Sequence, residues 1–244
     1  MGSSKPQRLV LFDIDGTLLR AGPMWTESYL GAVAEVFPDF KPEKVRFGGK
    51  TDFQICKEIL RDFGIPDPVI DELAPAIIHR YLEKAGSLLS SRGQEMKLLP
   101  GVVELLKALS EHPDVSLGIL TGNVRKGAQM KLSHAGLLEH FSDEDAATDL
   151  LGAFGDDHWN RYELPRVAVA RAFHTTGVDF SGKEVVVIGD TEHDVNCGKS
   201  IGVRSIAVGT GRDVPKELIL AHKPDYFFEN LSATQEVVRA ILCE

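Results

Sequence analysis

The first apolar segment of the chain leads directly into two carboxylates. Residues 9–19 read LVLFDIDGTLL, so that Asp13 and Asp15 follow an apolar run and precede Gly16 and Thr17. Such a run predicts a buried parallel strand, and open α/β sheets place their sites at the carboxyl ends of these strands. Two carboxylates this close need a positive charge between them, and a divalent cation is the simplest. The alternative is an Asp-rich turn without chemistry.

The composition is that of an acidic globular protein. The chain has 244 residues, of which 43% are hydrophobic and 26% charged, enough for a full core. A net charge of −9 argues against nucleic acid or an anionic membrane as a partner, because these need clustered Lys and Arg. No apolar run approaches the ~18 residues of a membrane span, and residues 1–6 lack the apolar core of a signal peptide. We therefore expect a cytoplasmic protein.

The three cysteines, Cys56, Cys197 and Cys243, are far apart in the sequence and odd in number. This usage suits a reducing compartment better than a disulfide framework, because structural disulfides need paired cysteines. We expect three free thiols.

Helical periodicity replaces the strand pattern after residue 19. Apolar residues recur at helical spacing in three segments, 26–37, 51–63 and 67–89. Thr51 and Gln54 fit a capping box at the start of the second segment, and Pro75 predicts a kink or a restart within the third.

An all-helical block directly after the first strand predicts a separate small domain. We expect an α/β core formed by residues 1–20 and 98–244, and a helical domain with hinge-like linkers formed by residues 21–97.

Helices and strands alternate over the rest of the chain. Strands are expected at 115–120, 185–188, 205–208 and 226–228, with a weaker one within 146–154. Helices of ten to fifteen residues between strands imply right-handed crossovers and a parallel sheet covered by helices on both faces. Ser232 and Gln235 predict a second capping box before the last helix.

Polar residues follow two further strands of this predicted sheet. Thr121, Gly122 and Asn123 come after one strand, and Asp190 and Asp194 come after another. Each group alone could be a satisfied turn. Because parallel strands direct their carboxyl ends to one sheet edge, the groups together place carboxylates and a hydroxyl where phosphoryl transfer requires them.

In this order, the three groups resemble the first, second and fourth motifs of the haloacid dehalogenase superfamily, most of whose members are magnesium-dependent phosphatases. The helical insert resembles the small helical cap of its phosphoglycolate-phosphatase-like members. The resemblance covers roughly the whole chain. It implies a Rossmann-like parallel sheet with an inserted cap domain.

The resemblance also implies roles for individual residues. Asp13 would be the nucleophile that forms an aspartyl-phosphate, and Asp15 the general acid and base. Thr121, with the amides of Gly122 and Asn123, would bind the phosphoryl oxygens.

A magnesium ion is the implied cofactor. Mg²⁺ would be bound by the side chains of Asp13 and Asp190 and by the backbone carbonyl of Asp15. Asp194 would lie behind these ligands or hold a coordinating water.

The third motif departs from the pattern of the superfamily, which usually shows a lysine followed by a proline-rich turn. Residues 158–165 read HWNRYELP here, with Arg161 at the corresponding offset. An arginine can bridge a carboxylate and a phosphate with its planar fork, but it does not simply replace a compact ammonium. The alternatives are a surface arginine, with Lys126 or Lys183 as the missing positive charge.

The loop before the second helical segment reads FGGKTD over residues 47–52. Lys50 next to a capped helix N-terminus is suited to close over a phosphorylated substrate, and the loop resembles the one that phosphoglycolate-phosphatase-like enzymes insert into their active sites. The alternative is a flexible turn with a solvated Lys50.

The leading functional hypothesis is a hydrolase of small phosphate monoesters, either phosphoglycolate-like compounds or sugar phosphates. The expected partner is a small phosphorylated metabolite, and the protein is expected as a monomer or homodimer. The sequence argues against a dehalogenase, because the 2-haloacid enzymes of this superfamily lack the second acidic residue of the first motif, which is Asp15 in this chain. The alternatives are a phosphoglucomutase-type isomerase and a non-catalytic domain. Intact buried carboxylates argue against the latter.

Overall fold

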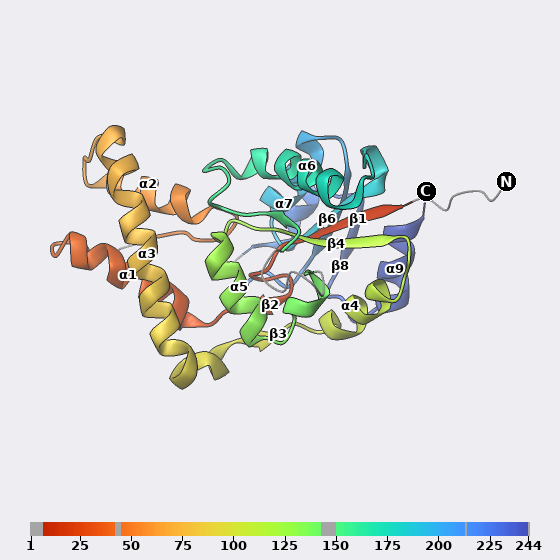
Figure 1. Ribbon diagram of the computed structural model, residues 1–244, viewed down its shortest axis with the longest axis horizontal. Coiled ribbons are helices and arrows are strands. Elements are labelled where there is room, and N and C mark those ends of the chain that lie inside the picture. The colour runs from red at the N-terminus through yellow and green to blue at the C-terminus, as the bar shows by residue number, and fades with distance from the viewer. Residues whose placement is uncertain (1–6, 42–44, 143–149, 213, 244) are drawn as a thin grey trace.

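Six parallel strands form one sheet in the order β5-β4-β1-β6-β7-β8 (Figure 1). The computed structural model describes residues 7–41, 45–142, 150–212 and 214–243. The strands are β1 (Arg8–Phe12), β4 (Val115–Leu120), β5 (Gly152–Ala153), β6 (Val185–Gly189), β7 (Arg204–Val208) and β8 (Tyr226–Phe228). The predicted parallel α/β sheet is confirmed, and β1 lies between β4 and β6.

Both faces of the sheet are covered because alternate residues of β1 are buried on opposite sides. Val10 and Phe12 belong to one core cluster, and Leu9 and Leu11 to another. The first cluster includes residues of α4 (Val102–Ser110), α5 (Arg125–His134) and α9 (Thr234–Leu242). The second includes residues of α6 (Leu164–Thr176) and α7 (Glu192–Ser200), and α8 (Lys216–Ala221) packs on α7.

Three helices lie beside the sheet, at the left end of Figure 1. They are α1 (Pro23–Val36), α2 (Asp52–Asp62) and α3 (Asp67–Arg92), and both α1 and α2 pack against α3. A short antiparallel ribbon, β2 (Leu19–Arg20) with β3 (Lys97–Leu98), closes this insert. We propose that residues 21–97 are the cap, because both connections to the core pass through this ribbon.

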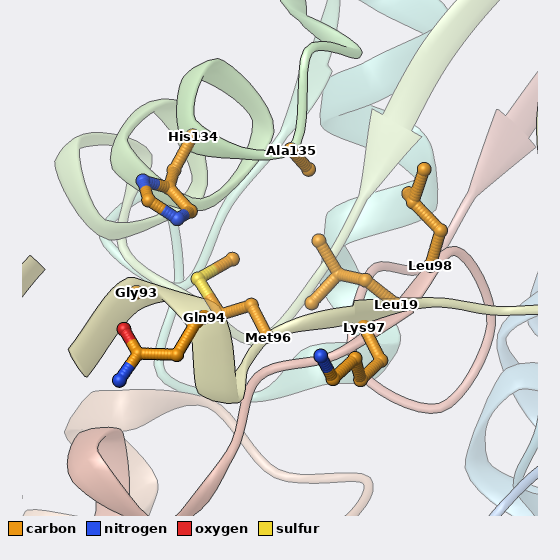
Figure 2. Close-up of a pocket in the computed structure, with 8 residues that line it drawn as sticks. All are labelled: Leu19, Gly93, Gln94, Met96, Lys97, Leu98, His134 and Ala135. Carbon is orange, nitrogen blue, oxygen red and sulfur yellow. The ribbon is translucent and has the colours of Figure 1, made fainter.

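The cap packs against the core helix α5. A Cβ added at Gly127 would lie 3.3 Å from a Leu82 methyl, and one at Gly86 would lie 3.3 Å from the Met130 Cε. A cavity of about 160 Å³ lies next to the ribbon, between β2, β3 and the C-terminal end of α5 (Figure 2). Its lining includes Leu19, Leu98 and His134. This cavity adjoins the cap–core connection and does not include the predicted acidic residues.

Short 3₁₀ helices connect several of these elements. They are η1 (Gly93–Glu95), η2 (Leu138–His140), η3 (Arg161–Glu163) and η4 (Gly182–Glu184).

Within the part of the chain that the structure describes, none of the helices has both the length and the apolar character that a membrane span requires. All three cysteines are free, as expected.

Several local predictions were wrong in detail. Thr51 caps α2, but Gln54 donates its side-chain amide to Glu58 and does not complete the box. Of the kink or restart predicted at Pro75, the restart is absent, because helix α3 continues through that residue. Helix α9 begins after Ala233 with no side-chain cap, so the second capping box is absent there.

The short strand predicted within 146–154 is confirmed at the end of that range. Residues 152–153 form β5, while the stretch before Leu150 lies outside the described residues.

Candidate active site

Three buried carboxyl groups meet at the carboxyl edge of the sheet. Asp13 follows β1, Asp190 follows β6, and Asp194 lies in the first turn of α7. One carboxylate oxygen from each residue lies within 4.8 Å of the others. We call these three residues the acidic cluster. The parallel pairing of β1 with β6 brings the first two together, as the sequence predicted.

Gly16 and Thr17 shape the loop that carries the chain past this cluster. Gly16 has a φ of +91°, and a Cβ built there would lie 2.2 Å from Oδ2 of Asp190. The Thr17 hydroxyl donates to Oδ1 of Asp190 at 3.0 Å. The turn therefore needs glycine both for its backbone conformation and for the close approach of Asp190.

Asp194 is oriented by the capping box of α7. The Thr191 hydroxyl donates to its Oδ2 at 2.7 Å, and the Thr191 backbone N–H donates to the same atom at 3.0 Å. These contacts leave Oδ1 facing Arg161, to which it is ion-paired. Asp194 is thus part of the acidic cluster and also caps a helix.

Arg161 is the cation of this cluster. It lies on η3 and is only 4% exposed, and its Nη2 is 3.0 Å from Oδ1 of Asp13 while also contacting Asp194. Lys126 is exposed on α5, and Lys183 pairs with Asp225 at the surface. Arg161 is therefore no surface arginine. Of the three candidates for the third-motif charge, it is the one that contacts the cluster.

The charges in the cluster are unbalanced. Burial raises the pKa of Asp13 to about 6, although Arg161 opposes the shift, and burial raises the pKa of Asp190 well above its usual range. The cluster sets three carboxyl groups against one guanidinium. A divalent cation bound by oxygen atoms would relieve this excess of negative charge, so the residues present fit a magnesium site.

Asp15 points to a different set of partners. Its Oδ2 accepts hydrogen bonds from Asn123 Nδ2 at 2.7 Å and from Lys131 Nζ at 2.6 Å. The Asp15 side chain remains 38% exposed, whereas that of Asp13 is only 7% exposed. The two carboxyl groups of the first motif therefore occupy distinct environments.

The residues after β4 divide their functions. The Thr121 hydroxyl accepts a hydrogen bond from Asn123 Nδ2 at 2.9 Å, and its proximity to Asp13 lowers the pKa of that carboxyl against the larger effect of burial. The Asn123 side chain makes hydrogen bonds with Thr121, Asp15 and Lys131. The side-chain amide of Asn123 therefore supports other residues, and its backbone amide remains the group predicted to bind phosphoryl oxygens.

Comparisons with known proteins identify the family. A model of haloacid dehalogenase-like hydrolases matches residues 7–202. The chain belongs to this family. The hydrolase is 27% identical to pyrophosphatase PpaX of Halalkalibacterium halodurans over 233 residues. The aligned region covers 94% of this chain and 95% of PpaX. It is 27% identical to a phosphoglycolate phosphatase of Vibrio vulnificus strain YJ016 over 237 residues, 95% and 96% of the two chains.

Solved structures share the fold of the hydrolase. A putative β-phosphoglucomutase from Bacteroides vulgatus matches with a TM-score of 0.69 at 20% identity, covering 99% of this chain and 93% of that one. The predicted fold class and family are both confirmed.

Residues 47–52, which we call the cap loop, pack on the turn after β4. The Asp52 backbone N–H donates to the Gly122 carbonyl at 2.9 Å, and Oδ2 of Asp52 accepts from the Val124 N–H at 2.8 Å. The Thr51 hydroxyl donates to the Trp159 carbonyl at 2.7 Å. A Cβ on Gly122 would lie only 1.9 Å from the Lys50 carbonyl oxygen. Cap and core are therefore in direct contact beside Thr121.

The Lys50 side chain does not join the acidic cluster. Its ammonium pairs with Glu58 on α2, within the cap. The structure thus brings the Lys50 backbone to the core, while the side chain is held by the cap.

Two residues at this site escaped the sequence interpretation. Asp52 is buried, and burial raises its pKa to about 6. Lys131 is 4% exposed. The available signal for Lys131 was its place on the apolar stripe of α5, next to Leu132 and one turn after Ala128, where a lysine is costly unless paired.

Proposed function

We propose that this hydrolase is a phosphatase of small phosphate monoesters, which acts through an aspartyl-phosphate on Asp13. One observation carries the proposal: Asp13 is buried in an acidic cluster next to Arg161, while Asp15 lies outside that cluster with its carboxyl partly exposed. This separation provides one carboxylate for attack and another for proton transfer. The names of the two curated relatives, a phosphoglycolate phosphatase and a pyrophosphatase, support phosphorylated substrates.

In the first step, a carboxylate oxygen of Asp13 attacks phosphorus as the bond to the leaving oxygen breaks. Arg161 and the Thr121 hydroxyl lie beside Asp13, where they can stabilise the phosphoryl oxygens. The backbone amides of Gly122 and Asn123 are the other donors proposed for this role.

Asp15 is the proposed proton carrier. Its carboxyl group gives a proton to the leaving alkoxide, and its carboxylate then takes a proton from the water that attacks the aspartyl-phosphate. The products are an alcohol and inorganic phosphate, and Asp13 and Asp15 return to their starting states.

Mg²⁺ is the proposed cofactor, held by Asp13 and Asp190 with the Asp15 carbonyl. Asp194 lies close enough to join the ligands or to hold a coordinating water. When bound, the ion supplies charge stabilisation for the phosphoryl oxygens. The chain's own contribution is to position Asp190 through Thr17 and Asp194 through Thr191.

The proposed cap covers the substrate. Lys50 is proposed to bind the anionic end of a small substrate such as a phosphorylated hydroxy acid, in exchange for its pairing with Glu58. We further propose a cytoplasmic protein, acting as a monomer or homodimer on a small phosphorylated metabolite.

Phosphate release from a panel of phosphorylated metabolites, with and without Mg²⁺, tests the proposal. The panel includes 2-phosphoglycolate, pyrophosphate, hexose phosphates and p-nitrophenyl phosphate. We expect release that depends on Mg²⁺ and that disappears in Asp13→Asn, which keeps the side-chain shape but loses the nucleophilic oxygen. Asp179→Asn, at an exposed position, is the matched control. Release at the wild-type rate from a folded Asp13→Asn variant would remove Asp13 from the mechanism.

The isomerase alternative has its own readout in the same experiment. A phosphoglucomutase-type enzyme would convert a hexose 1-phosphate to the 6-phosphate without releasing free phosphate. Such conversion would replace the phosphatase proposal.

A further inference from the structure

Lys131 has a buried ammonium that the proposed chemistry does not yet use. It lies on the inner face of α5, and its side chain is 4% exposed. Burying an ammonium is costly unless it is paired and hydrogen-bonded, so its partners indicate what it is for.

The partners of Lys131 surround it from core and cap. The ammonium donates to Oδ2 of Asp15 at 2.6 Å and to Oδ1 of Asn123 at 2.7 Å. On the cap side, the indole ring of Trp25 on α1 lies over it, with 4.8 Å from Nζ to the ring centroid. The pair of hydrogen bonds and the ring fix the position of the nitrogen.

Asn123 extends this arrangement into a small network. The Asn123 Oδ1 accepts from Lys131, and the Asn123 Nδ2 donates to Oδ2 of Asp15. Lys131 donates to the same Oδ2, so the lysine and the amide hold one oxygen of the Asp15 carboxylate. The carboxyl group keeps one oxygen, Oδ1, outside this pair of contacts, and the side chain remains partly exposed.

We propose that Lys131 is a positioning residue, which holds Oδ2 of Asp15 so that Oδ1 faces the leaving oxygen of the substrate. The proposal rests on the proposed function, because it assumes the proton step assigned to Asp15. Trp25 places one side of the ammonium under the cap, so that a residue of the substrate-covering domain also supports the proton carrier. A purely structural role, in which Lys131 only fills the cap–core interface, is the competing explanation.

The leaving group of the substrate distinguishes the two roles. An alkyl phosphate needs a proton on its departing oxygen, whereas p-nitrophenolate departs without one. Since kcat/KM reports the steps up to the first irreversible one, it isolates departure of the leaving group from hydrolysis of the aspartyl-phosphate. The test compares kcat/KM for the best alkyl phosphate of the panel with that for p-nitrophenyl phosphate.

Lys131→Met should lower kcat/KM for the alkyl phosphate by about 10²-fold, the lower end of what a positioned general acid contributes. The loss for p-nitrophenyl phosphate should be about tenfold smaller, and KM should change little for either. Lys126→Met is the matched control, since it removes the same charge from an exposed position of the same helix. It should behave as wild type on both substrates.

A double-mutant cycle supplies a second readout. In an Asp15→Asn background, Lys131→Met should cost little further activity, because the group it positions is gone. If Lys131→Met does not fold, Lys131→Arg carries the same test. It keeps the charge beside Asp15 but replaces the single nitrogen with a planar fork, so the loss should again be larger for the alkyl phosphate.

Equal losses of kcat/KM on both substrates, or no loss on either, would overturn the proposal and leave Lys131 with a structural role.

The test of the proposed function has a separate outcome. If Asp13→Asn retains phosphate release, the proposed function fails whatever Lys131 does. If Asp13→Asn is inactive and Lys131→Met matches Lys126→Met, only the positioning role fails.

Discussion

The guanidinium of Arg161 contacts the carboxyl of Asp13, with 3.0 Å between Nη2 and Oδ1. The same nitrogen is ion-paired with Asp194, so one planar side chain spans the strand end of β1 and the first turn of α7. An arginine at this position keeps its charge at all physiological pH values. The nucleophile proposed here therefore has a permanent cation from its own chain beside it.

Arg161→Ala should lower phosphate release by at least about 10²-fold, because a charge-assisted contact to the transferring group is lost. It should also reduce the free energy of unfolding by about 3–5 kcal/mol in the absence of Mg²⁺, since the buried carboxylates would keep no cation. Urea denaturation of Arg161→Ala and of the exposed-site control Arg166→Ala measures the second effect. An unchanged midpoint in Arg161→Ala would show that the acidic cluster does not need this charge to fold.

Mg²⁺ should stabilise the wild-type fold and should fail to do so in Asp190→Asn. An ion that binds only the native state adds about 2.7 kcal/mol to the free energy of unfolding when its concentration is a hundred times its Kd. Asn at this position can still accept from the Thr17 hydroxyl, so the loop geometry is retained while one charge is removed. Thermal unfolding over a Mg²⁺ series gives the result, with the exposed-site variant Asp179→Asn as control. The same thermal shift in Asp190→Asn as in wild type would place the metal elsewhere.

Asp52 should make the cap–core contact less stable as pH rises. Burial raises its pKa to about 6 from 3.8, against the opposing effects of the Val124 N–H and Lys131, while Asp15 and Asp156 add to the rise. The folded state therefore binds more protons than the unfolded state between about pH 4 and 6. Stability falls as pH rises through this window and stays constant, for this group, above it.

The comparison with Asp52→Asn isolates that contribution, because Asn keeps an acceptor for the Val124 N–H and carries no charge. Relative to wild type, the variant should gain about 2 kcal/mol in unfolding free energy when pH is raised from 4.5 to 8. Chemical denaturation of both proteins at the two pH values measures it. A constant difference would mean that Asp52 titrates normally in the folded protein.

Gly122→Ala should prevent the cap loop from seating on the core. The added methyl would meet the Lys50 carbonyl oxygen at 1.9 Å, and because that oxygen belongs to the backbone, no side-chain rotation relieves the contact. We expect kcat/KM to fall by at least about tenfold, because a closed site strengthens the electrostatic contacts of the transition state. Gly48→Ala is the control within the same loop, since a Cβ there meets nothing within 4 Å. Equal activity of the two variants would indicate that this contact is not needed for turnover.

The strand ends were predictable because they are local patterns with one geometric consequence. An apolar run followed by Asp13, Thr121 or Asp190 could be recognised in the sequence, and parallel pairing then brought the three ends to one edge. Arg161 was named from its offset in a resembling motif, but its burial between two carboxyl groups came only from the structure.

Contacts made across long sequence separations were not predictable from such patterns. Lys131 meets Asp15 from a helix more than a hundred residues away, and Asp52 meets Val124 across the cap–core boundary. Local chemistry also misled at the second capping box, because Ser232 donates its N–H to Asn230 in a turn before α9 and does not cap the helix.

The β2–β3 ribbon has a consequence for how relatives of this chain can diverge. Leu19 and Leu98 are paired across the ribbon, so the chain leaves the core and returns to it at nearly the same point. A block of any length and shape can be joined at such a point without moving β1 or the residues that follow it. If the insert covers the substrate, as we propose, selection can exchange it while the reaction chemistry is inherited intact, so new substrates would be acquired through changes in the insert.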